Sequence, residues 1–203
     1  MRLLTRRRAP RAIDAAQEAA WVERARAGEA EAFDQLVRLH FARIYSLLFR
    51  LVGNHEDAED MAQDCFVKAQ RSLGWYRGEA SFGTWLYRIA VSLSRDHHRK
   101  RGRRMSLLEA PGELAEPAVR GGGPADETQR RELGLALREA IDALPHRLRA
   151  ALVMRTQENL EYEEIARVLN ITLHTARVHV MKARRRLERS MRAWIDDSDE
   201  VQS

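Results

Sequence analysis

The chain has 203 residues, a length that suits one domain or two small ones and excludes a large multidomain enzyme. It is 44% hydrophobic but only 6% aromatic, with 32% charged residues, which is typical of helices rather than of strand-rich folds. The single cysteine, Cys65, excludes an intramolecular disulfide framework and a thiolate zinc cluster. The sequence contains no apolar run of about 18 residues and no secretory signal, so we expect a soluble cytoplasmic protein.

Helical spacing of apolar residues predicts three helices in the first half of the chain. Gly53 fits beyond the end of the first helix, Asn54 is placed to cap the second, and Ser81 is placed to cap the third. These helices make up a predicted first domain over residues 30–104. Residues 1–29 are predicted to be a basic N-terminal tail and a lead-in helix.

Glycine and proline replace the apolar period over residues 105–131, which predicts a flexible linker. Four helical stretches follow over residues 132–192, the second predicted domain, and residues 193–203 form an acidic tail. The predicted fold class is therefore all-α, with two small helical domains joined by a flexible linker, the second a helix-turn-helix domain.

A helix-turn-helix pattern begins at Tyr162. A short helix ends at Asn170, Ile171 fills the turn, and Thr172 caps a second helix. Seven basic residues against one acid over 177–192 allow this second helix to neutralise phosphates, and its polar face can enter a major groove. The alternative is an amphipathic helix with a solvated basic face. The polar face holds His174, Val178, Lys182 and Arg185, flanked by Arg177, Met181 and Arg184.

A second basic face is predicted on the helix that follows Ser81, opposite its apolar stripe. The loop before this helix contains Trp75, Tyr76 and Arg77. Cations beside aromatic rings suit single-stranded DNA, because phosphates bind the cations while unstacked bases lie on the rings. From the residues alone, a structural role for the two rings stays open. The polar face comprises Thr84, Arg88, Ser92, Arg95 and Arg99.

The helix capped by Asn54 carries the opposite charge, with five acids against two basic residues over 55–72. An acidic face repels DNA, so it is expected either to contact a protein or to be a solvated surface.

The triplet Asp96-His97-His98 is a candidate for a metal-dependent phosphoesterase. Adjacent helix positions point about 100° apart, however, and the surrounding basic residues repel a cation. We expect no catalytic residues, no metal site and no cofactor, and therefore no enzyme.

Three segments together resemble the extracytoplasmic-function (ECF, group IV) sigma factors, members of the sigma-70 family of bacterial RNA polymerase. They are the run from Asp57 to Ala69, the run from Tyr76 to Ala90, and Ala143-Leu144-Pro145 followed by the helix-turn-helix. The resemblance implies an alternative sigma factor that binds core RNA polymerase and directs promoter recognition, melting and transcription initiation for a stress or envelope regulon. The alternative is a helix-turn-helix transcriptional regulator that does not bind core polymerase.

The resemblance also implies roles for the two domains. Residues 30–104 would be region 2, which binds core polymerase and the minus 10 element, and residues 132–192 would be region 4, which reads the minus 35 element. The implied contacts with the coiled coil of the polymerase β′ subunit are Asp57, Asp60, Gln63, Asp64 and Phe66. The implied minus 10 contacts are Lys68, Trp75, Tyr76, Arg77, Thr84, Arg88, Ser92, Arg95 and Arg99. The implied minus 35 contacts are His174, Thr175, Arg177, Val178, Met181, Lys182 and Arg184.

The implied partners are core RNA polymerase through its β′ and β subunits, promoter DNA and an anti-sigma factor, without a small-molecule substrate. Two segments depart from the family pattern. Ser92 stands where the family usually has asparagine, and the recognition helix keeps Thr175 and Arg177 while its neighbours differ. The promoter sequence therefore does not follow from the resemblance.

Overall fold

The computed structural model describes residues 15–105 and 124–200, and its regular elements in these ranges are helices, which confirms the all-α class. The predicted basic tail up to residue 14, most of the predicted linker and the last three residues lie outside the described residues. Among the described residues, no helix is both long and apolar enough to cross a membrane.

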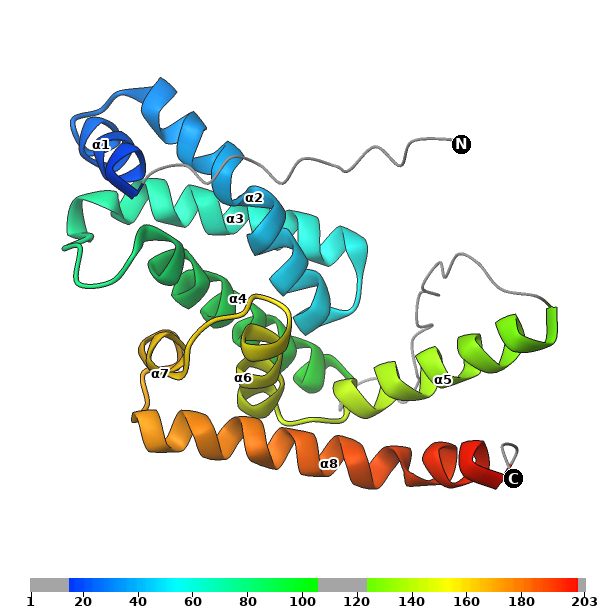
Figure 1. The fold of residues 1–203 in the computed structure, drawn as a ribbon. Helices are drawn as coiled ribbons and strands as arrows, with labels where there is room; N and C mark the ends of the chain where they lie inside the picture. The colour runs from blue at the N-terminus through cyan, green and yellow to red at the C-terminus, as the bar shows by residue number, and fades with distance from the viewer. Residues whose placement is uncertain (1–14, 106–123, 201–203) are drawn as a thin grey trace, which may run out of the picture.

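The N-terminal group of helices holds the larger core. It consists of α1 (Ala15–Arg26), α2 (Ala30–Val52), α3 (His55–Ser72), the short 3-10 helix η1 (Leu73–Trp75) and α4 (Phe82–Met105). Helices α2, α3 and α4 pack against one another, and α1 packs on α2 (Figure 1). Leu36, Leu47 and Leu86 are fully buried between them, and the Cys65 thiol lies 3.7 Å from the carbonyl of Leu86.

The predicted caps of this group are present. Gly53 ends α2 with a φ of 77°, a left-handed conformation that glycine adopts without a side-chain clash. The Asn54 side chain accepts a hydrogen bond from the Asp57 backbone N–H at 3.1 Å. The Ser81 hydroxyl accepts one from the Thr84 backbone N–H, also at 3.1 Å. These local signals set the starts of α3 and α4.

The C-terminal group consists of α5 (Pro124–Asp142), α6 (His146–Thr156), α7 (Tyr162–Leu169) and α8 (Leu173–Glu200). In Figure 1, α8 runs along the bottom, with α6 and α7 between it and α4. Asn170 ends α7 with a φ of 51°, and the Thr172 hydroxyl accepts from the Thr175 backbone N–H at 3.1 Å. This turn between α7 and α8 is the predicted helix-turn-helix.

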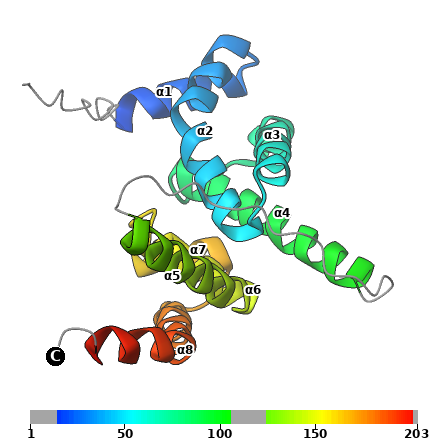
Figure 2. The same ribbon diagram turned by 90° about the vertical axis from the view of Figure 1, so that its right-hand side faces the viewer.

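The two groups of helices are in direct contact, although the sequence predicted a flexible connection between them. Helix α6 packs against α2 and α4, and α7 packs against α4 (Figures 1 and 2). The Tyr87 hydroxyl donates to Glu158 at 2.8 Å, and Ser94 and His146 are joined by a hydrogen bond of 2.8 Å. Buried side chains of both groups form one continuous cluster.

A polar cluster lies where α4 meets α6. The buried Arg149 guanidinium donates to Asp142 at 2.6 Å, and the His98 and His146 rings lie 5.4 Å apart between centroids. Ser94 donates its own proton to the carbonyl of Val91, so His146 Nε2 must be the donor in its bond to Ser94. His146 Nδ1 is buried without a hydrogen-bond partner among the described residues. Burial and the neighbouring positive charges lower the pKa of His146 to about 4.

Acidification should therefore destabilise the contact between the two groups. Because the pKa of His146 falls from 6.5 to about 4 in this environment, the neutral ring stabilises the contact fully above pH 6.5, and this contribution is lost as pH falls toward 4. Between pH 7 and pH 5 the free energy of unfolding should fall by ~2 kcal/mol from this group, at 1.36 kcal/mol per pKa unit. Urea denaturation at the two pH values measures the change.

His146→Gln is the matched control, since it removes the titrating ring and keeps a polar side chain. The variant should show a smaller loss of stability between pH 7 and pH 5 than the natural chain. The same pH dependence in both proteins would contradict the assignment.

Candidate nucleic-acid interface

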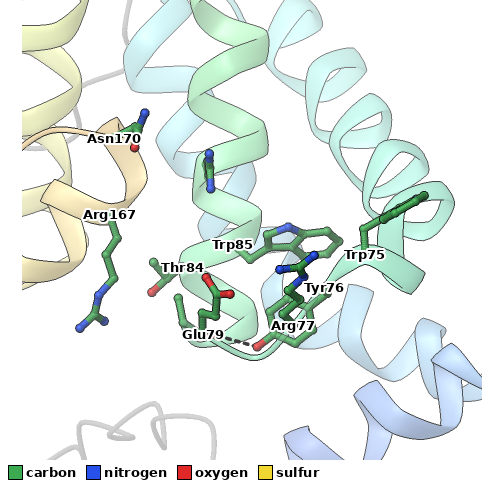
Figure 3. Close-up of a pocket in the computed structure, with 10 residues that line it drawn as sticks. Trp75, Tyr76, Arg77, Glu79, Thr84, Trp85, Arg167 and Asn170 are labelled. Carbon is green, nitrogen blue, oxygen red and sulfur yellow. Dashed lines mark hydrogen bonds between the residues drawn. The ribbon is translucent and has the colours of Figure 1, made fainter.

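A pocket of about 440 Å³ lies between the loop after η1, the start of α4 and the turn of the helix-turn-helix (Figure 3). Its walls combine aromatic rings with arginines and one carboxylate. A planar base can stack on such rings while its phosphates lie near the arginines. The lining residues are Trp75, Tyr76, Arg77, Glu79, Ala80, Thr84, Trp85, Arg88, Arg167 and Asn170.

The structure places the two rings of the loop in different settings. Trp75 is 82% exposed and lies at one edge of the pocket (Figure 3). Tyr76 is half-buried, its ring lies 5.8 Å from that of Phe82, and burial raises its pKa. The Tyr76 hydroxyl donates to the carbonyl of Ala80 at 2.6 Å. The sequence left a structural role open for both rings, and Tyr76 has one: it packs against the core and holds the loop closed.

The predicted basic face of α4 is largely accessible. Arg88, Ser92, Arg95 and Arg99 are exposed on α4. Thr84 is the exception at 4% exposure.

Helix α7 covers Thr84. The Thr84 hydroxyl donates to Glu164 of α7 at 3.4 Å, and it also shares a hydrogen bond of 2.8 Å with Ser81. The sequence placed Thr84 on the open polar face, but in the structure the C-terminal group buries it.

The acidic face of α3 is exposed at Asp60, Gln63 and Asp64. Asp57 is partly exposed, and its carboxylate lies 3.7 Å from His97 Nε2. Phe66 differs from the expectation of an accessible contact. It is 5% exposed and stacks on Phe41 with 6.0 Å between ring centroids, so it is a core residue in this structure. Lys68, from the predicted minus 10 set, is exposed on the same helix.

The second helix of the helix-turn-helix presents its predicted face to solvent. Ala176, Val180 and Ala183 are buried, which fixes how α8 is rotated. The Arg177 guanidinium lies 5.7 Å from the Tyr162 ring centroid, a cation–π contact that holds the start of α8 against α7. The exposed residues of the predicted set are His174, Arg177, Met181, Lys182 and Arg184, and the partly exposed ones are Thr175 and Val178.

Five residues that line the pocket are not in the predicted minus 10 set. Glu79 and Ala80 belong to the loop that precedes α4, and Trp85 lies in the first turn of α4. Arg167 and Asn170 come from the C-terminal group. A local pattern cannot indicate that these last two residues approach a loop about 90 positions earlier, because that depends on how the two groups pack.

The carboxylate of the candidate metal triplet, Asp96-His97-His98, lies among arginines. Asp96 lies 3.9 Å from Arg95 and 3.7 Å from Arg99, so cations already surround its carboxylate. Among the side chains that the structure describes, in residues 15–100 and 133–192, no three histidine, cysteine or acidic groups are placed together as metal ligands.

Family models and curated relatives match the chain along most of its length. The Sigma-70 region 2 model matches residues 36–104, and the Sigma-70 region 4 model matches residues 134–187. The RNA polymerase sigma-H factor of Pseudomonas aeruginosa is 36% identical over 188 residues, which covers 90% of this chain and 97% of the relative. The ECF RNA polymerase sigma-E factor of Escherichia coli is 33% identical over 180 residues, which covers 86% and 94%.

Two solved structures share the fold. The sigma factor RpoE of Bartonella quintana, in complex with the anti-sigma factor NepR, has a TM-score of 0.64 at 21% identity and covers 80% of this chain and 98% of that one. CnrH, in complex with the cytosolic domain of CnrY, has a TM-score of 0.64 at 21% identity and covers 87% and 98%. The two region models and the curated relatives place the chain in the extracytoplasmic-function group of the sigma-70 family of RNA polymerase sigma factors.

Proposed function

We propose that this ECF sigma factor binds core RNA polymerase through the exposed acids of α3, reads the minus 35 element with α8, and captures an unpaired base of the minus 10 element beside Trp75. The observation that carries the proposal is Trp75, an indole 82% exposed at the edge of a pocket that also holds arginines. Bases in a duplex are already stacked on their neighbours, so such a pocket favours an opened strand.

Capture of an extruded base supplies a route to promoter opening without nucleotide hydrolysis. Unstacking and unpairing one base costs a few kcal/mol, and stacking on an aromatic side chain returns about 1 to 3 kcal/mol per base. The arginines of α4 add attraction for the phosphates of the same strand. Binding energy at the pocket therefore offsets much of the cost of opening.

The alternative is a helix-turn-helix regulator that does not bind polymerase. Such a protein needs α7 and α8 but neither an acidic protein-binding face on α3 nor a strand-binding pocket. Both features, together with membership of the sigma family, favour the sigma factor. We infer that core polymerase through β′ and β, promoter DNA and an anti-sigma factor are its partners.

Reversal of charge on α3 tests the polymerase contact. Asp60→Lys with Asp64→Lys should weaken binding of core polymerase by about 3 kcal/mol or more, roughly a hundredfold, because like charges then face each other. Both side chains are exposed, so the helix should stay folded. Asp34→Lys with Glu139→Lys makes the same charge change at exposed positions of α2 and α5, outside the acidic face of α3, and should bind normally. Equal binding by the two double variants would contradict the assignment.

Alanine substitutions on α8 separate base reading from backbone contact. If Arg177 or Lys182 reads a guanine, its replacement by alanine should cost about 1 to 3 kcal/mol in minus 35 binding and relax the preference at one base pair. Binding to a library of minus 35 sequences measures both effects. Arg189→Ala, further along α8, should leave sequence preference unchanged. A uniform loss across all sequences would assign Arg177 and Lys182 to phosphates.

Trp75→Ala tests strand capture. The variant should fold normally, because the indole is exposed, and should lose about 1 to 3 kcal/mol in promoter opening. Transcription should recover in part on a template whose minus 10 segment is already unpaired, and Trp75→Phe, which keeps a ring, should retain part of the activity. Tyr76→Ala should instead destabilise the protein, since its ring packs on Phe82 and Trp85. Equal defects of Trp75→Ala on duplex and pre-melted templates would refute strand capture.

A further inference from the structure

His40 is a buried polar side chain of the N-terminal group that the proposed function does not use. It lies on α2 and is 6% exposed. Its Nε2 atom lies 3.1 Å from a carboxylate oxygen of Glu18 on α1. Because a carboxylate only accepts hydrogen bonds, Nε2 carries the proton and donates it to this bond. The bond therefore ties α1 to α2 at a partly buried position.

The His40 ring also packs on the start of α4. Its centroid lies 5.6 Å from that of Phe82. Gly83 follows, and a methyl group on this glycine would lie only 3.3 Å from Cε1 of His40. The absence of a side chain at position 83 thus lets the imidazole approach the first turn of α4, and a larger residue there would press on the ring.

The first turn of α4 forms one wall of the pocket beside Trp75. The Phe82 ring meets that of Tyr76 edge-on, with 5.8 Å between centroids, and lies 5.5 Å from that of Trp85. Tyr76 and Trp85 line the pocket together with Trp75. The His40 ring therefore supports, through Phe82, two of the aromatic walls of the pocket.

Helix α1 approaches the same wall. It packs on α2 and on η1, at the end of α3 (Figure 1). Burial raises the pKa of Tyr76, and the negative charges of Glu18 and Glu23 raise it further. Both carboxylates therefore act on this edge of the pocket, and their charge alone would repel the phosphates of a strand. Their partners differ, because Glu18 is bonded to His40 whereas Glu23 pairs with an arginine of α1 at 3.0 Å.

We propose that His40 is a positioning residue for base capture and that α1 is part of the capture site. Glu18 orients the imidazole, the imidazole fixes the first turn of α4, and this turn places the rings of Tyr76 and Trp85. The proposal rests on the strand capture proposed for the pocket. Neither His40 nor Glu18 contacts the strand. Loss of Glu18 therefore weakens promoter opening, even though it removes a negative charge near the DNA.

Two charge-matched variants of α1 test the proposal in the holoenzyme formed with core polymerase. Glu18→Ala removes the partner of His40, and Glu23→Ala removes the same charge from the same helix. The probe is a duplex promoter fragment selected from a random-sequence library with the natural holoenzyme. Permanganate oxidation of unpaired thymines measures opening of this fragment, and circular dichroism of the free chains measures folding.

Glu18→Ala should lower the equilibrium constant for opening about fivefold relative to Glu23→Ala, a part of the stacking energy of one base. Glu18→Gln keeps an oxygen that accepts from the imidazole and should keep most of the opening. Gly83→Ala should also lower opening, because the added methyl displaces the His40 ring while both carboxylates remain. Alanine is favoured over glycine within a helix, so this variant separates capture from folding.

Equal opening by Glu18→Ala and Glu23→Ala would overturn the proposal. A loss that persists in full when Trp75→Ala is also present would overturn it too, because the α1 variant would then act outside the pocket. If Glu18→Ala fails to fold, Gly83→Ala decides, and normal opening by that variant overturns the proposal.

The natural holoenzyme keeps this proposal distinct from the function. If it opens the selected fragment and Trp75→Ala impairs opening, the proposed function stands, whatever the α1 variants show. If it selects no fragment, the proposed function fails on its own test.

Discussion

The rest of the structure depends on how the surface of α4 is divided. This one helix faces the core of the N-terminal group, the C-terminal group and solvent. Residues turn by about 100° along a helix, so stripes three and four residues apart face separate directions. Leu86 and Ala90 face the core of the N-terminal group. Tyr87 and Ser94 face the C-terminal group, as their hydrogen bonds show. Arg88, Arg95 and Arg99 remain exposed to solvent on the face that we propose for nucleic acid. Thr84 borders the second stripe, which explains why α7 buries it.

Local chemistry allowed much of the fold to be predicted. Asn54, Ser81 and Thr172 each offer a side-chain oxygen to a backbone N–H three residues later, and each cap is present in the structure. The turn of the helix-turn-helix was equally visible, because Asn170 tolerates positive φ where β-branched residues do not. Such signals depend on residues within one turn of each other, and sequence patterns report those well.

The packing of the two groups was not predictable in this way. Periodicity identified one apolar stripe on α4. A second stripe faces the C-terminal group and includes Ser94, a polar residue that a sequence pattern assigns to the surface. Its partner His146 lies 52 positions later. Phe66 was assigned from the resemblance to the family, and Tyr76 from its place in an aromatic loop beside a basic helix face. No local signal distinguishes a ring that packs inward from one that contacts a partner.

The contact between the groups contains buried polar side chains as well as apolar ones. Burial of the Arg149–Asp142 pair removes both charges from water, which costs much of what their attraction returns. His98 Nε2 lies 2.7 Å from the carbonyl of Leu51 and 3.1 Å from a nitrogen of Arg149. The carbonyl needs a proton on that atom, whereas the guanidinium needs a lone pair, so only one of the two bonds can form. At this position, replacement of the protein partner by water therefore loses little.

The loop before α4 loses its conformational freedom when the protein folds, because contacts within the loop hold it closed. Gly78 adopts a φ of 73°, and the bond from Tyr76 to the Ala80 carbonyl ties the ends of the loop together. The backbone beside Trp75 is thus ordered when the protein folds rather than when DNA arrives. In the proposed strand capture, an incoming strand meets an ordered loop and loses freedom only in its own backbone and in the indole. The temperature dependence of promoter opening should therefore be set mainly by the DNA, through the heat needed to unstack its bases.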